Sequence, residues 1–121
     1  MPKTPASPKT LPLAKAAARA AADKKGEDVV LLNVARFSAL TDYLVIASAT
    51  SPAHLEALQY GVEDALDGKA RLSRCEGRRS DTWRVLDYGG VMVHLMRPET
   101  REFYGLEKIF RGCRTTRVSD A

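Results

Sequence analysis

Residues that bind metals or form disulfides are scarce in this sequence. Its 121 residues include two cysteines and two histidines. Cys75 and Cys113 lack the spacing of a zinc or redox motif, and His54 and His94 do not complete one. We therefore predict free thiols, a reducing compartment and no bound metal. A disulfide between the two cysteines is the less favoured alternative.

Long apolar segments are also absent. No apolar run approaches the roughly 20 residues that a membrane-spanning helix requires, and no secretory signal follows Met1. These absences predict a cytoplasmic protein that neither enters a membrane nor is exported. A transit peptide would be richer in Arg and more amphipathic than residues 1–10, so we disfavour that alternative.

The net charge of +4 is unevenly distributed along the chain. Residues 1–25 carry a net charge of +5, residues 26–110 carry −3 and residues 111–121 carry +2. A mildly acidic body is better suited to a basic protein surface than to phosphate. The basic ends are suited to add non-specific, salt-sensitive affinity for RNA.

The first half of the chain predicts a tail, a helix and two strands. Three prolines and several polar residues indicate a flexible tail over residues 1–10. Residues 11–25 are rich in Ala at helical spacing, so we expect a helix whose small side chains pack weakly. Residues 28–34 and 43–49 are short, nearly continuous apolar runs, which is the pattern of strands buried on both faces.

A second helix is predicted to begin at Pro52 and to end near Leu66. Ser51 is a favoured N-cap, and Pro52 suits the first helical position. Gly61 lies inside this helix, where close contact with a neighbouring element would account for it. A helix at this place can connect parallel strands, which favours a mixed sheet.

The segment from Trp83 to Phe110 concentrates the aromatic and titratable residues. It holds the only Trp, two of the three Phe and one of the two His. Residues 87–89 form the tip of a predicted hairpin, in which Gly supplies a positive φ. The return strand places Val91, Val93 and Leu95 on one face, and Met92, His94 and Met96 on the other. A helix follows from Pro98, and we expect Gly105 to interrupt it.

Together these elements predict one α/β domain over residues 11–110, with a mixed β-sheet flanked by helices. A further short strand is expected at residues 72–75. Residues 111–121 are expected to form a second flexible tail.

Enzymatic chemistry finds little support in the spacing of the polar residues. A nucleotidyltransferase holds Mg²⁺ with an Asp-x-Asp pair after a Gly-Ser turn, and no Asp-x-Asp occurs here. Ser51 lacks the Gly-rich context of a phosphate loop, and Asp87 is expected to stabilise its turn. His94 is expected to be a buried or half-buried strand residue. A magnesium-dependent enzyme acting on a nucleotide with Asp42, Asp87 and Ser51 is kept as the alternative.

The aromatic residues divide into two groups. Trp83 and Phe103 are predicted to belong to the core. Tyr88 and Tyr104 are expected at the surface among charged residues, an arrangement that resembles a protein-interface hot spot.

Several segments together resemble the ribosomal silencing factor (RsfS, or Iojap-like) family. The resemblance covers residues 13–110, in the order and at the separations of that family. The matching segments are TDYLVIASATS from Thr41, WRVLDYG from Trp83, VMVH from Val91, REFY from Arg101 with the following Leu106–Glu107, and Asp23–Lys25 before the first strand.

The resemblance implies a nucleotidyltransferase-like α/β fold that lacks the catalytic carboxylates, needs no cofactor and is not an enzyme. It further implies binding to the large ribosomal subunit at its β-barrel protein number fourteen, which blocks joining of the small subunit and represses translation. Gly90 and Gly105 stand where many members have Asp, which removes negative charge near the implied contact. The implied ribosomal-protein-binding residues are Asp42, Tyr43, Trp83, Asp87, Tyr88, His94, Glu102 and Tyr104. Ribosomal RNA bound through the basic tails is a further expected partner. A homodimer through a sheet edge or through the return strand is another.

Overall fold

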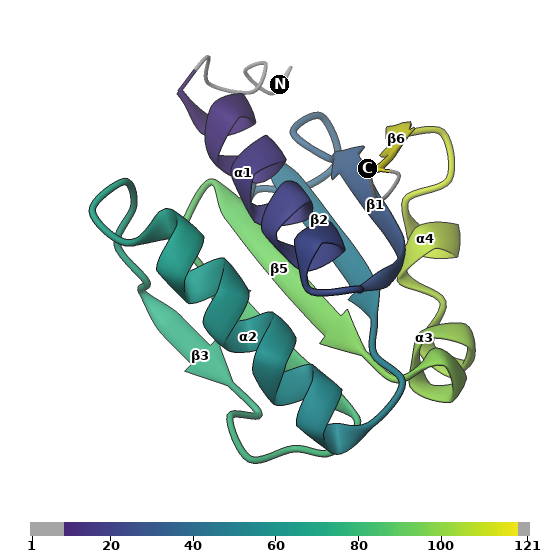
Figure 1. Cartoon of the computed structure of the whole chain (residues 1–121). Coiled ribbons are helices and arrows are strands. Elements are labelled where there is room, and N and C mark those ends of the chain that lie inside the picture. Colours follow the sequence, from purple (N-terminus) through teal and green to yellow (C-terminus); the bar gives the residue numbers. More distant parts are fainter. Residues whose placement is uncertain (1–8, 119–121) are drawn as a thin grey trace.

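The computed structural model describes residues 9–118 (Figure 1). Its elements in chain order are α1 (Thr10–Asp23), β1 (Glu27–Asn33), β2 (Tyr43–Ser48), α2 (Pro52–Leu66), β3 (Arg74–Glu76), β4 (Trp83–Asp87), β5 (Val91–Met96), α3 (Pro98–Tyr104), α4 (Leu106–Ile109) and β6 (Arg114–Arg117).

The strands form one mixed sheet in the order β3-β4-β5-β2-β1-β6. The central strands β2 and β5 are parallel, and all other neighbours are antiparallel. The connection from β2 to β5 runs through α2, β3 and β4, so the predicted crossover is confirmed. The mixed α/β fold predicted from the sequence is therefore confirmed as well.

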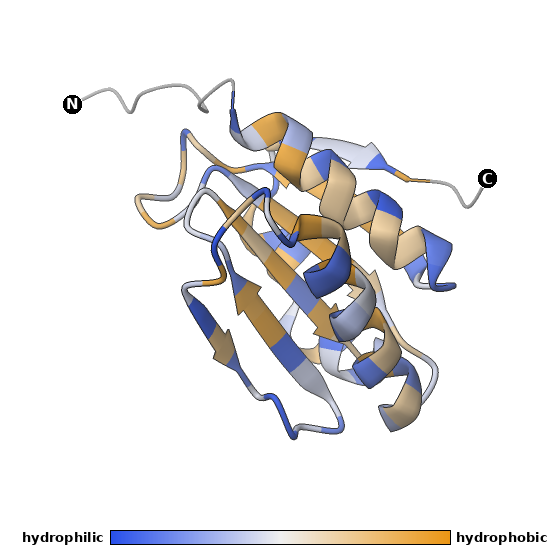
Figure 2. Cartoon of the chain, turned by 60° about the vertical axis from the view of Figure 1, so that its left-hand side comes forward, coloured by the Kyte–Doolittle hydropathy of each residue, from blue (hydrophilic) through white to orange (hydrophobic). Residues whose placement is uncertain are grey.

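Helices α1 and α2 lie side by side on one face of the sheet (Figure 1). Four alanines of α1, at positions 14, 17, 18 and 21, are fully buried there, because their small side chains let the helix approach the sheet closely. The other face carries a smaller apolar cluster that includes Leu32, Ile46 and Met96, against which Leu106 and Phe110 pack. Figure 2 shows hydrophobic residues gathered in the central strands.

The residues predicted to begin α2, to pack within it and to end α3 do so in the structure. Ser51 Oγ accepts a hydrogen bond from the N–H of His54 at 3.0 Å and caps α2, with Pro52 in the first turn. A Cβ on Gly61 would lie 2.7 Å from the Lys24 side chain, so close packing against the end of α1 accounts for this glycine. Gly105, with φ of 58°, ends α3 and separates it from α4.

The two predicted tails need correction. Residues Arg114–Arg117 form β6, which pairs antiparallel with β1, so the prediction of a frayed end is wrong for these residues. The sequence Arg-Thr-Thr-Arg has no apolar alternation, and its strand conformation comes from the edge of β1 that it completes. Helix α1 begins at Thr10, one residue inside the predicted first tail. Residues 1–8 and 119–121 lie outside the described residues.

None of the helices described combines the length and the apolar character of a membrane span.

The first turn of α1 lies on the hairpin between β4 and β5. Thr10 Oγ1 donates a hydrogen bond to Asp42 Oδ2 at 3.0 Å, and the Asp42 N–H donates to the carbonyl of Gly90 at 2.9 Å. A Cβ on Gly90 would overlap the Thr10 methyl group. Glycine at this position therefore makes room for Thr10.

We expect Gly90→Ala to lower the free energy of unfolding by about 1 kcal/mol, because the added methyl group overpacks against Thr10. In a Thr10→Ala background the same change should be neutral or stabilising, since replacing Gly with Ala restricts the unfolded chain. Thermal unfolding of the four proteins by circular dichroism measures both effects. An equal cost in both backgrounds would show that Thr10 is not the obstacle.

Candidate protein-docking surface

The sheet face opposite α1 and α2 is open over β3, β4 and β5. Along β4, Arg84 and Leu86 point toward α2. The alternating residues Trp83, Val85 and Asp87 point to the open face. The open side forms a groove of about 400 Å³, whose lining includes two acidic residues, Glu76 and Asp87, and one basic residue, Arg74. The groove is lined by Leu40, Arg74, Glu76, Trp83, Val85, Asp87, Met92 and His94.

Trp83 is held in this groove by a hydrogen bond to His94. The indole Nε1–H donates to His94 Nδ1 at 3.0 Å, and the ring centroids are 5.9 Å apart. Burial lowers the pKa of His94 to about 4, so the imidazole is neutral near pH 7 and carries its proton on Nε2. His94 is thus a buried strand residue, as predicted, and its role is to fix the orientation of Trp83.

Trp83 continues into an aromatic cluster with two residues of α3. The ring centroids of Trp83 and Tyr104 are 4.8 Å apart, and Phe103 meets Tyr104 edge to face at 5.0 Å. Phe103 is 82% exposed and Tyr104 is 53% exposed. The prediction that Phe103 belongs to the core is wrong, because α3 has only seven residues and its last turn faces solvent. We call Trp83, Phe103 and Tyr104 the aromatic cluster.

Arg101 anchors the helix that carries this cluster. Its guanidinium donates to Glu107 at 2.8 and 3.2 Å, and to Ser48 Oγ at 2.9 Å. The Arg101 hydrogen bonds hold the pKa of Glu107 below its usual value. The Arg101 side chain is nearly buried, so this contact ties α3 both to the end of β2 and to α4. This anchoring role is not evident from the sequence, because Arg101, Ser48 and Glu107 are brought together only by the fold.

Three of the predicted binding residues lie on the helix-covered side of the sheet. Tyr43 is buried beneath α1, and Asp42 bonds Thr10. Tyr88 packs against the core, and burial raises its pKa to about 12. Of the other five, Trp83, Asp87 and His94 line the groove on the open face, and Tyr104 contacts Trp83. Glu102 is exposed on α3 and lines a separate hollow with Arg101 and Glu107.

The residues of the alternative enzyme do not converge. Asp42 and Asp87 lie at the end of the sheet where β2 begins, whereas Ser51 follows the opposite end of β2. Asp87 Oδ1 instead accepts the Gly89 N–H at 2.8 Å, which is the predicted turn contact. Within residues 9–118, no group of three or more His, Cys, Asp or Glu is placed to hold a metal ion.

Leu40 is a groove residue that sequence reasoning missed. It is 80% exposed at the end of the loop between β1 and β2. A lone Leu in a loop carries no periodic pattern, so only its position opposite Met92 and Val85 reveals its place in the groove.

Fold and surface define a small α/β protein with helices on one face of a mixed sheet and an open groove with exposed aromatic residues on the other. A family model described as "Ribosomal silencing factor during starvation" matches residues 6–121. The chain belongs to the ribosomal silencing factor family, whose members are ribosome-associated silencers of translation. The match extends beyond residue 110 and so includes β6.

Relatives and solved structures agree with this assignment. The ribosomal silencing factor of Treponema pallidum is 32% identical over 111 residues, 86% of this chain and 95% of that protein. The mouse "Mitochondrial assembly of ribosomal large subunit protein 1" is 38% identical over 91 residues, 72% of this chain but only 40% of the mouse protein. A crystal structure of a Chromobacterium violaceum protein is 28% identical with a TM-score of 0.80, covering 92% of this chain and 94% of the other.

The His94 pKa predicts a pH-dependent stability. The folded pKa of about 4 lies below the ordinary 6.5, so the unfolded chain binds more protons between these values. The free energy of unfolding should therefore fall by about 3 kcal/mol as the pH drops from above 6.5 to 4. Urea denaturation followed by far-ultraviolet circular dichroism at several pH values measures this fall.

The matched variant for this prediction is His94→Gln. The lowered pKa of Glu107 acts in the same direction in both proteins, so the difference between their pH profiles isolates His94. Parallel profiles would contradict the assignment.

Replacing Arg101 should loosen α3. Arg101→Met removes hydrogen bonds from a nearly buried guanidinium and should cost about 2 kcal/mol of unfolding free energy. The control is Arg78→Met, which breaks an exposed pair with Glu63 at 3.4 Å and should cost less than about 1 kcal/mol. Chemical denaturation gives both values, and equal costs would argue against the anchoring role.

Proposed function

We propose that the open face docks on the large ribosomal subunit at its β-barrel protein number fourteen and blocks joining of the small subunit. The observation that carries the proposal is the exposure of Phe103 and Tyr104 beside the groove. Large aromatic side chains that stand exposed next to a concave surface are the usual anchors of protein interfaces.

The anchors are held in place before a partner arrives. Tyr104 rests on Trp83, Trp83 bonds His94, and Arg101 fastens α3 to the sheet. A preorganised surface loses less conformational entropy on binding, so more of the contact energy contributes to affinity.

The charge of this surface supports a basic partner. Two acidic residues, Asp87 and Glu76, line the groove against one basic residue, Arg74, and residues 26–110 carry a net charge of −3. An acidic surface accelerates encounter with a basic protein and makes the rate sensitive to salt. Silencing by this route requires occupancy alone, and no chemical step.

Tyr104→Ala should weaken cosedimentation with purified large subunits by about tenfold or more, since it removes a central aromatic anchor. Tyr60→Ala is the matched control, because Tyr60 is 52% exposed on α2, on the other side of the sheet, against 53% for Tyr104. The control should bind as the unaltered protein does.

A second readout tests the block itself. Adding the protein to large subunits before small subunits should lower the fraction of joined ribosomes on a sucrose gradient, and Tyr104→Ala should restore joining. Equal binding of large subunits by Tyr104→Ala and Tyr60→Ala would contradict the proposal. Full joining of the subunits in the presence of bound protein would also contradict it.

A further inference from the structure

A second surface lies at the opposite edge of the sheet from the groove. β6 is the edge strand on this side, whereas the groove is built on β3, β4 and β5. Two hollows adjoin here, of about 340 and 310 Å³, and share Asn33 and Arg114. These two residues are directly opposed across β1 and β6, so the two hollows meet at this pair.

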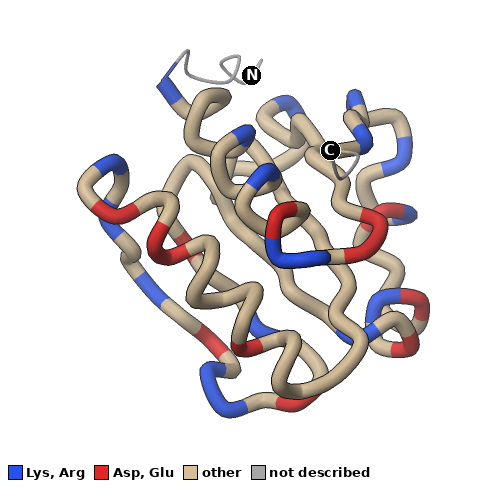
Figure 3. Tube along the Cα trace, viewed as in Figure 1, with Lys and Arg blue, Asp and Glu red and all other residues tan. Residues whose placement is uncertain are grey.

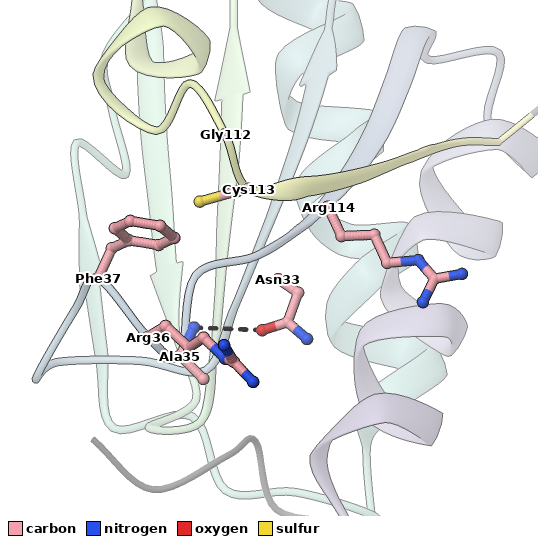
Figure 4. A pocket seen from close by; sticks show the side chains of 7 residues that line it. All are labelled: Asn33, Ala35, Arg36, Phe37, Gly112, Cys113 and Arg114. Carbon is pink, nitrogen blue, oxygen red and sulfur yellow. Dashed lines mark hydrogen bonds between the residues drawn. The ribbon is translucent and has the colours of Figure 1, made fainter. Parts of the chain in front are cut away.

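The first hollow combines an exposed ring with two guanidinium groups (Figure 4). Phe37 is 57% exposed on the loop after β1, and Arg36 precedes it. Asn33 Oδ1 accepts the Ala35 N–H at 3.2 Å, which fixes the amide and turns its nitrogen away from that bond. Figure 4 shows this nitrogen between the guanidinium groups of Arg36 and Arg114.

The second hollow adds Lys15 from α1 and Thr116 from β6. None of the residues that line either hollow is acidic. Residues 108–118 likewise contain four basic residues and no Asp or Glu (Figure 3). We call the surface formed by Lys15, Asn33, Arg36, Phe37 and Arg114 the basic edge.

The arginines of the basic edge are available to a partner. Within residues 9–118, the ion pairs involve Arg74, Arg78 and Arg101, so neither Arg36 nor Arg114 is neutralised by a described carboxylate. Guanidinium groups in hollows that no carboxylate lines favour a partner with repeated negative charge.

We propose that the basic edge binds an unpaired, single-stranded segment of RNA. Arg36, Arg114 and Lys15 are placed for successive phosphates, Phe37 offers a stacking platform for a base, and the Asn33 amide can donate to a base edge. This combination of a basic groove and an exposed aromatic ring is the usual design of single-strand binding sites. The inference goes beyond the protein-docking proposal, because it concerns a different surface. The family's association with the ribosome supports RNA as the anionic partner.

An acidic peptide is the competing occupant. Its carboxylates would pair with the same arginines and accept from the Asn33 amide, but a chain of acidic residues has no planar base to stack on the exposed Phe37 ring. RNA uses every polar and aromatic group of the basic edge, so the observations favour it.

Fluorescence anisotropy of the full chain with a short, labelled single-stranded RNA of mixed sequence tests the proposal without ribosomes. Arg36→Ala with Arg114→Ala should weaken binding about tenfold or more. It should also reduce the slope of log K against log salt by roughly 1.4, since each phosphate contact on a single strand contributes about 0.7. Arg71→Ala with Arg79→Ala removes the same charge from exposed positions elsewhere and should leave both quantities nearly unchanged.

Phe37→Ala should weaken RNA binding about fivefold or more, through lost stacking, whereas Tyr60→Ala should not. A poly-glutamate peptide of equal charge should not compete efficiently. Equal losses in the two arginine pairs, no loss in Phe37→Ala, or equal competition by the peptide would each overturn the proposal.

The two cysteines provide an independent footprint. Both are free and half-buried, and burial raises the pKa of each thiol, but only Cys113 lines the hollow beside Phe37. Bound RNA should slow the reaction of Cys113 with a maleimide and leave that of Cys75 unchanged. Equal protection of both thiols, or of neither, would argue against the basic edge. Tyr104→Ala should retain RNA binding, so failure of ribosomal docking and failure of this inference are distinguishable.

Discussion

The parallel pairing of β2 with β5 at the centre of the sheet is the constraint on which the remaining structure depends. Parallel neighbours need a long crossover, and α2 provides it on the same face as α1. Because the crossover also contains β3 and β4, these strands extend the sheet past α3 and α4, which meet β4 only where Tyr104 packs on Trp83. Their far face therefore stays open, and the groove forms there.

The sequence predicts those elements whose own residues show an apolar, alternating or capping pattern. The apolar runs of β1 and β2, the capping by Ser51, the alternation of β5 and the break at Gly105 all appear as expected. The sequence does not predict β6, because its side chains show no strand pattern. Its strand conformation comes from its hydrogen bonds to β1.

The candidate site was predictable only in part, and for a related reason. Alternation places Trp83, Asp87 and His94 on one face, but it does not say which face the helices cover. Tyr43 and Tyr88 thus looked equivalent to Tyr104, although they pack against the helix side. Phe103 was expected in the core because aromatic residues usually are, and only the short span of α3 exposes it.

The hydrogen bond between Trp83 and His94 has a practical consequence. The protein contains a single Trp, and it lies in the floor of the candidate docking surface, against one Tyr ring and one buried imidazole. Any partner that covers this surface changes the polarity around that one indole. Tryptophan emission, excited above the absorption of tyrosine, thus reports on the open face, because no residue of the basic edge is a Trp.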